Sequence, residues 1–145
     1  MTIKEIQEEI IDEFSMFEDW MERYEHIIDL GKSLPLIEDT YKTGENLIKG
    51  CQSKVWLHSE LKDGTLDFSA DSDAILTKGI VALLLRVFQA QKPADILLAE
   101  LSFIDKIELK EHLSPTRANG LLSMIKQIKL YALAYQSKIG TNTNP

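Results

Sequence analysis

The chain has 145 residues, of which 44% are apolar, and this size and composition suit a single domain with a hydrophobic core. Its 16 basic and 23 acidic residues give a net charge of −7, which argues against nucleic acid as a partner because phosphate contacts need lysine and arginine. No apolar run approaches the roughly 20 residues of a membrane-spanning helix, and the single cysteine excludes an internal disulfide, so we expect a cytoplasmic protein that is not membrane-bound.

Two helices are predicted at the start of the chain. Thr2 to Glu5 fits a capping box, and apolar residues follow at helical spacings of 3, 4 and 4 up to Phe14. Ser15 to Glu18 fits a second capping box, and the apolar face after it predicts another helix that ends at Gly31. An irregular segment from Leu34 to about residue 45 comes next.

The middle of the chain has the alternating pattern of strands. Apolar and polar residues alternate over 55–61 and 66–70, and Asp63-Gly64 between them is a strong hairpin turn signal. Asn46-Leu47-Ile48 is a candidate third strand. We expect Trp56 to belong to the core, as most single tryptophans do.

The second half of the chain is predicted to be helical. Asp71-Ser72-Asp73 predicts the cap of a helix over 74–90, which is apolar nearly all round and therefore buried. Pro93 predicts the start of a short helix, 103–113 is expected to contain another, and Ser114-Pro115 begins the last long one. The fold class is therefore α+β, with a small antiparallel sheet of about three strands packed by helices. We expect one domain over residues 1–138 and a disordered tail over 139–145.

Cys51 is the candidate reactive residue. It follows Gly50, lies between Lys49 and Lys54, and precedes a predicted strand, so it sits in a turn that presents its side chain. We expect the two lysines to favour the nucleophilic thiolate. The alternative is a small buried hydrophobe.

The other candidate residues have weaker patterns. Asp73 is either part of a helix cap or a contact to a partner protein. Arg117 lies in the first turn of the last helix, where a cation opposes the helix dipole. It is either compensated by a carboxylate, a carbonyl or a partner protein, or it is an exposed arginine that the helix tolerates. The three histidines form no Cys–His motif and lack the paired spacing of a metal site, so we expect no bound metal.

Four blocks of this sequence resemble the SufE family, the sulfur-acceptor proteins of iron–sulfur cluster assembly. The blocks are Trp20-Met21-Glu22-Arg23-Tyr24 with the segment up to Leu34-Pro35, then 50–57, 71–79 and 113–121. They follow the family's order and together span most of the chain. The resemblance implies a fold like that of SufE and of the IscU scaffold.

The resemblance also implies a function. Cys51 would take a persulfide from a SufS-like cysteine desulfurase, which uses pyridoxal phosphate, and pass the sulfur to a SufBCD-like scaffold. The chain would stimulate the desulfurase without being one, and would hold no cofactor of its own. Gln52 becomes a binding residue that would hydrogen-bond the persulfide anion. Asp73 and Arg117 become binding residues that would support the Cys51 loop or lie on the surface that faces the desulfurase. The resemblance leaves open a monomer or a homodimer.

Three other functions compete with this one. A small-molecule enzyme with Cys51 as its nucleophile needs a base beside the thiol and turns over without a partner. A cluster scaffold needs several cysteine ligands, and this chain has one. An interaction module would be unaffected by loss of Cys51.

Overall fold

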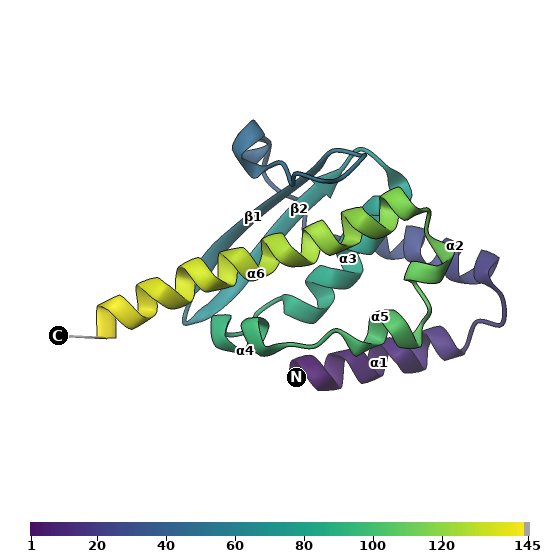
Figure 1. Ribbon diagram of the computed structural model, residues 1–145, viewed down its shortest axis with the longest axis horizontal. Helices are drawn as coiled ribbons and strands as arrows, with labels where there is room; N and C mark the ends of the chain where they lie inside the picture. The colour runs from purple at the N-terminus through teal and green to yellow at the C-terminus, as the bar shows by residue number, and fades with distance from the viewer. Residues whose placement is uncertain (144–145) are drawn as a thin grey trace.

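The computed structural model describes the backbone of residues 1–143 and the side chains of residues 1–138. Six helices and two strands follow one another in these residues (Figure 1). They are α1 (Ile3–Ser15), α2 (Trp20–Leu30), β1 (Val55–Lys62), β2 (Thr65–Ser72), α3 (Ile75–Phe88), α4 (Pro93–Leu98), α5 (Ser102–Lys106) and α6 (Pro115–Thr143). Short 3₁₀ turns lie at Gly31–Ser33, Asp39–Tyr41, Gly44–Asn46 and Lys110–His112.

The two strands form one antiparallel hairpin, which confirms the α+β class. They pair along their whole length from Val55–Ser72 to Lys62–Thr65, and the turn residues Asp63 and Gly64 both have positive φ, as a tight hairpin turn requires. The predicted third strand is wrong, because Leu47 makes only an isolated bridge to Trp56. The 3₁₀ turn Gly44–Asn46 comes directly before Leu47 and the loop turn at Gly50 follows it, so the pairing does not extend in either direction.

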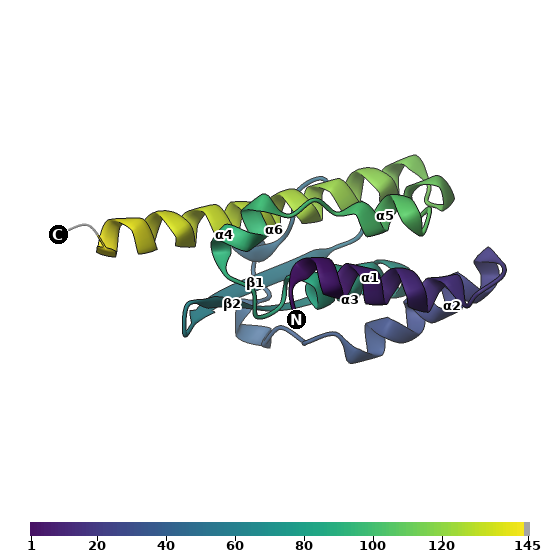
Figure 2. The ribbon, with the colours of Figure 1, turned by 90° about the horizontal axis from the view of Figure 1, so that it is seen from below.

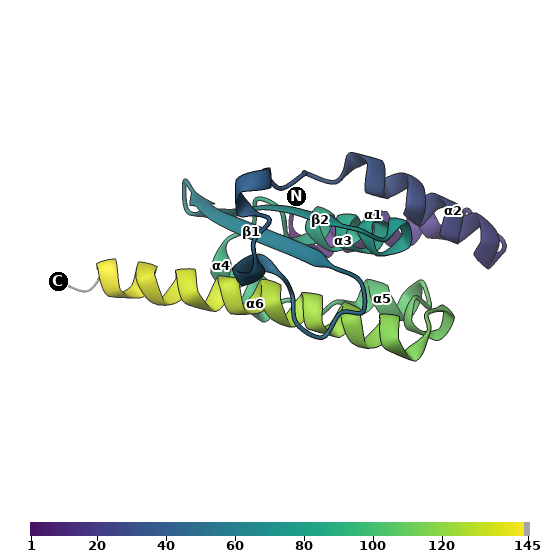
Figure 3. The same ribbon diagram turned by 90° about the horizontal axis from the view of Figure 1, so that it is seen from above.

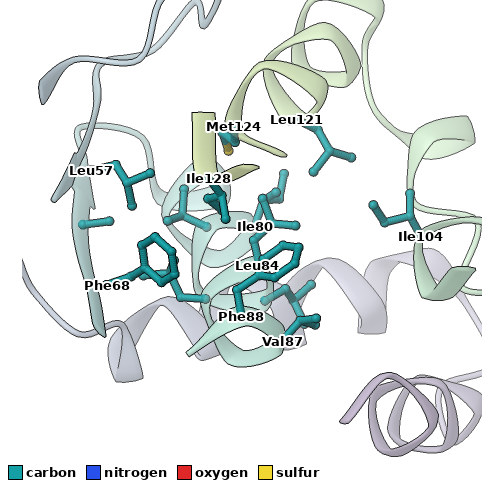
Figure 4. Packing of buried hydrophobic residues seen from close by; sticks show 14 of the residues in the cluster. Leu57, Phe68, Ile80, Leu84, Val87, Phe88, Ile104, Leu121, Met124 and Ile128 are labelled. Carbon is teal, nitrogen blue, oxygen red and sulfur yellow. The ribbon is translucent and has the colours of Figure 1, made fainter. Parts of the chain in front are cut away.

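Helix α3 lies at the centre of the molecule. It contacts α1, α2, α6 and β2, and Figures 2 and 3 show α2 on one side of this middle layer and α6 with α4 and α5 on the other. Figure 4 shows the main core, where side chains of the hairpin, α3 and α6 meet. Among these fully or nearly fully buried residues are Leu57, Phe68, Ile80, Leu84, Phe88, Met124 and Ile128.

Helices α2 and α3 approach each other closely at Gly79. A Cβ added at Gly79 would lie 2.0 Å from the carbonyl oxygen of Ile27, a distance too short for two non-bonded atoms. Gly79 therefore permits a close approach between backbones, and this packing fixes the position of α3, which contributes two residues to the cysteine site described below.

Two predicted helix caps are wrong. Helix α2 begins at Trp20 because Asp19 accepts a hydrogen bond from the Glu22 N–H, while Ser15 is the last residue of α1. Asp71 and Ser72 belong to β2, where they pair with β1, and α3 begins after Ala74 without a side-chain cap. Strand pairing thus prevails over the local capping preference of these residues.

The remaining predictions have mixed outcomes. The short helix after Pro93 and the long one after Ser114 are confirmed. Trp56 is not a core residue, because it is half-buried on the outer face of the hairpin with Lys42 Nζ 5.5 Å from its ring. The predicted tail over 139–145 overlaps α6, which continues to Thr143, and residues 144–145 lie outside the described residues. No helix within the described residues is long and apolar enough to cross a membrane.

Candidate functional site

Cys51 lies in a six-residue loop, residues 49–54, which is closed at its base by backbone hydrogen bonds. The Ile48 N–H donates to the Val55 carbonyl oxygen at 2.8 Å. Asp73 binds the same end of the loop twice: its Oδ1 accepts from the Lys54 N–H at 3.0 Å, and its own N–H donates to the Lys54 carbonyl oxygen at 3.3 Å. The Asp73 side chain therefore holds the end of the loop in place.

Gly50 lets the loop press against helix α6. Its φ is +91°, a conformation that other residues rarely adopt. A Cβ at this position would lie 2.5 Å from Oγ of Ser123, on the facing side of α6. Glycine therefore fits the position before the cysteine for two reasons: the backbone has a positive φ, and Ser123 leaves no space for a Cβ.

The thiol of Cys51 is partly buried against α6. Its Sγ lies 3.6 Å from the Gly120 carbonyl oxygen and donates a weak hydrogen bond to it. Gly120 is buried, and even a Cβ there would lie 3.6 Å from Sγ, an ordinary van der Waals distance, so the thiol packs directly against this turn of α6. Gly120 is therefore the residue of α6 against which the thiol packs.

A small cavity lies around the thiol and brings three of the four predicted site residues together. Its volume is about 10 Å³, barely enough for one water molecule. Cys51, Gln52 and Arg117 line it, whereas Asp73 lies at the base of the loop. The other lining residues are Ser53, Thr77, Ile80, Thr116, Gly120 and Met124.

Burial raises the pKa of the Cys51 thiol. This direction is opposite to the one expected from Lys49 and Lys54. Both lysines are exposed to solvent, which screens their charge from a thiol that faces α6. In this conformation Cys51 is a protonated, weakly reactive thiol, so the expectation of a favoured thiolate is wrong for it.

Comparison with known proteins identifies the family. The SufE family model, described as an Fe–S metabolism associated domain, matches residues 8–132. The chain belongs to the SufE family. An uncharacterized SufE-like protein of Rhizobium meliloti (strain 1021) is 42% identical over 127 residues, which cover 84% of this chain and 91% of that protein. Another, of Rhizobium etli, is 38% identical over 127 residues, covering 84% and 86%.

A solved structure supports the fold of this SufE-family chain. The solution structure of a hypothetical protein from Thermus thermophilus superposes with a TM-score of 0.76 at 15% sequence identity. The match covers 91% of this chain and 96% of the other. At this identity the similarity supports the arrangement of elements and nothing finer.

Arg117 lies at the start of α6 on the edge of the cavity. Its backbone N–H donates to Oγ of Ser114, which caps α6, and its side chain is exposed. Within the described residues its guanidinium makes no ion pair, which leaves a partner protein or a tolerated exposed arginine among the expected alternatives. The cation at the mouth of the cavity is free to meet an anion from outside.

None of the three histidines lines the Cys51 cavity of this SufE-family protein. His26 binds Glu13 at 2.9 Å, while His58 and His112 stack on Tyr41 and on Trp20. The base that a small-molecule cysteine enzyme needs is thus missing from the described residues around the thiol. No group of three or more potential metal ligands occurs in that part of the chain either.

Sequence reasoning missed Gly120 and Ser123, the two residues of α6 that contact the loop. Asn119 and Gly120 have low helix propensity although they lie in a helix, and this was the one sequence signal that could have marked Gly120. A much larger cavity, of about 600 Å³ between α1, α4 and α5, contains none of the four predicted site residues. Cavity size is therefore no guide to the reactive residue in this family member.

Proposed function

We propose that this chain accepts a sulfur atom on Cys51 from a cysteine desulfurase and carries it to an iron–sulfur scaffold. Membership of a family associated with Fe–S metabolism supports this class of function. The observation that carries the proposal is the setting of Cys51: the only thiol of the chain, on a short loop, with no histidine in its cavity. Sulfur transfer between proteins needs one thiol and a partner, not a base or a metal.

The transfer step is a thiolate exchange. The Cys51 thiolate attacks the terminal sulfur of the persulfide on the desulfurase, and a new S–S bond forms at Cys51. The S–S bond of the donor breaks, and the donor cysteine leaves as a thiolate that takes up the proton lost by Cys51. No oxidant or reductant is consumed. The chain has no second cysteine, so the persulfide cannot collapse into an internal disulfide.

The tucked loop is proposed to be the resting state. The thiol is protonated and partly buried there, so it reacts slowly with small molecules in the absence of the desulfurase. Docking draws the loop away from α6, which breaks the weak contact of Sγ with Gly120 and returns the thiol to a more polar setting. The positive φ of Gly50 makes it the hinge for this movement.

The other site residues have supporting roles in the proposal. Gln52 and Arg117 line the cavity and are the groups available to bind a persulfide anion or the desulfurase surface. Asp73 holds the base of the loop and so limits the movement to residues 49–53. The desulfurase is expected to be of the SufS type, with pyridoxal phosphate as its own cofactor, and the recipient a scaffold of the SufBCD type.

The rate of a SufS-type desulfurase with free cysteine tests the proposal. Addition of the chain should raise the rate of alanine formation, and Cys51→Ser should abolish that increase. An excess of Cys51→Ser should also compete with the wild-type chain, because docking does not need the thiol. A matched control is the double variant Cys51→Ser, Ser53→Cys, which moves the thiol two residues along the loop. It should restore little of the stimulation of the desulfurase.

Two results would contradict the proposal. Stimulation by Cys51→Ser equal to that of the wild type would remove the thiol from the mechanism. Turnover of a small-molecule thiol substrate by this chain alone, lost in Cys51→Ser, would instead favour the enzyme that uses Cys51 as its own nucleophile.

A further inference from the structure

Helix α6 differs in charge from the rest of the molecule. It contains four of the 16 basic residues, Arg117, Lys126, Lys129 and Lys138, and none of the 23 acidic residues. The remainder of the chain is therefore strongly acidic. Figures 2 and 3 show α6 along one flank of the molecule, and its C-terminal end extends past the hairpin. A basic helix is thus displayed at the edge of an acidic body.

The outward side of α6 carries an exposed apolar stripe. Leu122, Leu130 and Leu133 are 48%, 47% and 51% exposed, although leucine normally lies in the core. At 3.6 residues per turn these three lie within about 80° of one another around the helix, and the exposed Lys126 lies among them. We call Leu122, Lys126, Leu130 and Leu133 the outer face of α6. Its inner face already packs against the core through Leu121, Met124, Ile128 and Ala132.

The outer face is separate from the cysteine site. Gly120, which contacts the Cys51 thiol, lies about 160° around the helix from Leu122. Leu133 lies roughly 20 Å further along the axis than Gly120 at 1.5 Å per residue. A partner on the outer face would therefore leave the Cys51 loop uncovered and free to react.

We propose that the outer face of α6 docks an acidic amphipathic helix of another protein. Leucines at helical spacing fit an apolar stripe on a second helix, which buries both stripes. Lys126, which lies among these leucines with no acidic residue on α6, fits a carboxylate that flanks the partner's stripe and helps to fix its orientation. Three leucines offer a small interface, so the complex is expected to be weak and reversible.

Charge argues against the two other occupants of such a surface. The outer face of a second copy would bring another Lys126 and no anion, so a symmetric pair of these faces would suffer like-charge repulsion. An anionic membrane would attract α6 but would repel the acidic body beside it. A single acidic helix touches α6 alone and avoids both costs. The inference goes beyond the proposed function and does not rest on it.

The test is a titration with a fluorescein-labelled three-heptad peptide that has leucine at positions a and d and glutamate at e and g. The wild-type chain should bind it, and a Leu130→Gln, Leu133→Gln double variant should bind about tenfold more weakly or worse. Leu98→Gln is the matched control, because Leu98 is 82% exposed on α4 and should leave binding within about twofold. Lys126→Glu should weaken binding most at low salt.

Circular dichroism and unchanged transfer of sulfur to Cys51 confirm that the double variant is folded and that its cysteine site is intact. If the wild-type chain accepts no sulfur on Cys51, that result counts against the proposed function and not against the docking inference. Four outcomes overturn the docking inference itself. They are no peptide binding by the wild type, equal binding by wild type and double variant, preferential binding to phosphatidylserine vesicles, and dimerisation that the double variant abolishes.

Discussion

Replacing Gly50 with alanine is expected to destabilise the fold and to displace the Cys51 loop. The φ of +91° alone costs an alanine about 1–2 kcal/mol. The new Cβ would also lie 2.5 Å from Oγ of Ser123, and relieving such overpacking costs roughly 1–3 kcal/mol. Because the Ser123 hydroxyl can rotate away, we expect a total loss of about 2–4 kcal/mol in the free energy of unfolding.

Gly64→Ala is the matched control for the backbone contribution. Gly64 has a φ of +83°, close to that of Gly50, but a Cβ there would meet nothing within 4 Å. Its substitution should cost only the backbone strain of about 1–2 kcal/mol. The difference between the two variants is the cost of the contact with Ser123. Adding Ser123→Ala to Gly50→Ala should recover part of that difference, since the remaining contact is 3.3 Å.

Urea unfolding and the alkylation rate of Cys51 by iodoacetamide measure the two effects. In Gly50→Ala the loop is pushed off α6, so the thiol leaves its cavity and should react several times faster than in the wild type. Gly64→Ala should leave that rate unchanged. The reasoning is refuted if Gly50→Ala is no less stable than Gly64→Ala and its Cys51 reacts at the wild-type rate, because the loop would then not be held against α6.

Three more predictions concern the residues that hold the site. Asp73→Ala should cost about 1 kcal/mol and speed alkylation of Cys51, while Asp73→Asn keeps an oxygen for the Lys54 N–H and should behave as wild type; equal rates in all three would exclude a loop-holding role. Gly79→Ala should cost about 3 kcal/mol or more in thermal unfolding, because its Cβ meets the backbone of Ile27 at 2.0 Å; an unchanged Tm would contradict this packing. Burial raises the pKa of Cys51, so the folded chain keeps a proton that the unfolded chain loses above about pH 8.5; stability should therefore fall with rising pH there, and a Cys51→Ser variant with the same slope would exclude the thiol as the cause.

The elements that the sequence predicted best are those with local causes. The alternating pattern of the two strands and the Asp63-Gly64 turn signal lie within a few residues of each other. The structure confirms the hairpin that they predict. Pro93 likewise marks the start of its helix, because proline suits the first helical position. The two caps failed for different reasons. Ser15 and Asp19 both suit a cap and lie close together, and Asp19 caps α2. Asp71 and Ser72 pair with β1 and so do not cap α3.

The cysteine site was predictable in position but not in environment. The glycine before Cys51 indicated a turn with positive φ, and Gly50 has one. The burial of the thiol depends on Gly120, which is 69 residues away in the chain and has no local signal toward Cys51. The expected influence of Lys49 and Lys54 failed for the same reason, since sequence proximity does not reveal that the thiol turns toward α6 while the lysines face solvent.

The intact mass of this chain after incubation with a persulfide-loaded SufS-type desulfurase tests the central claim most directly. The proposed function predicts a gain of one sulfur, about 32 Da, that maps to the peptide containing Cys51, is removed by a reductant and is absent in Cys51→Ser. An unchanged mass, with the persulfide still on the desulfurase, would contradict the assignment of Cys51 as the sulfur acceptor.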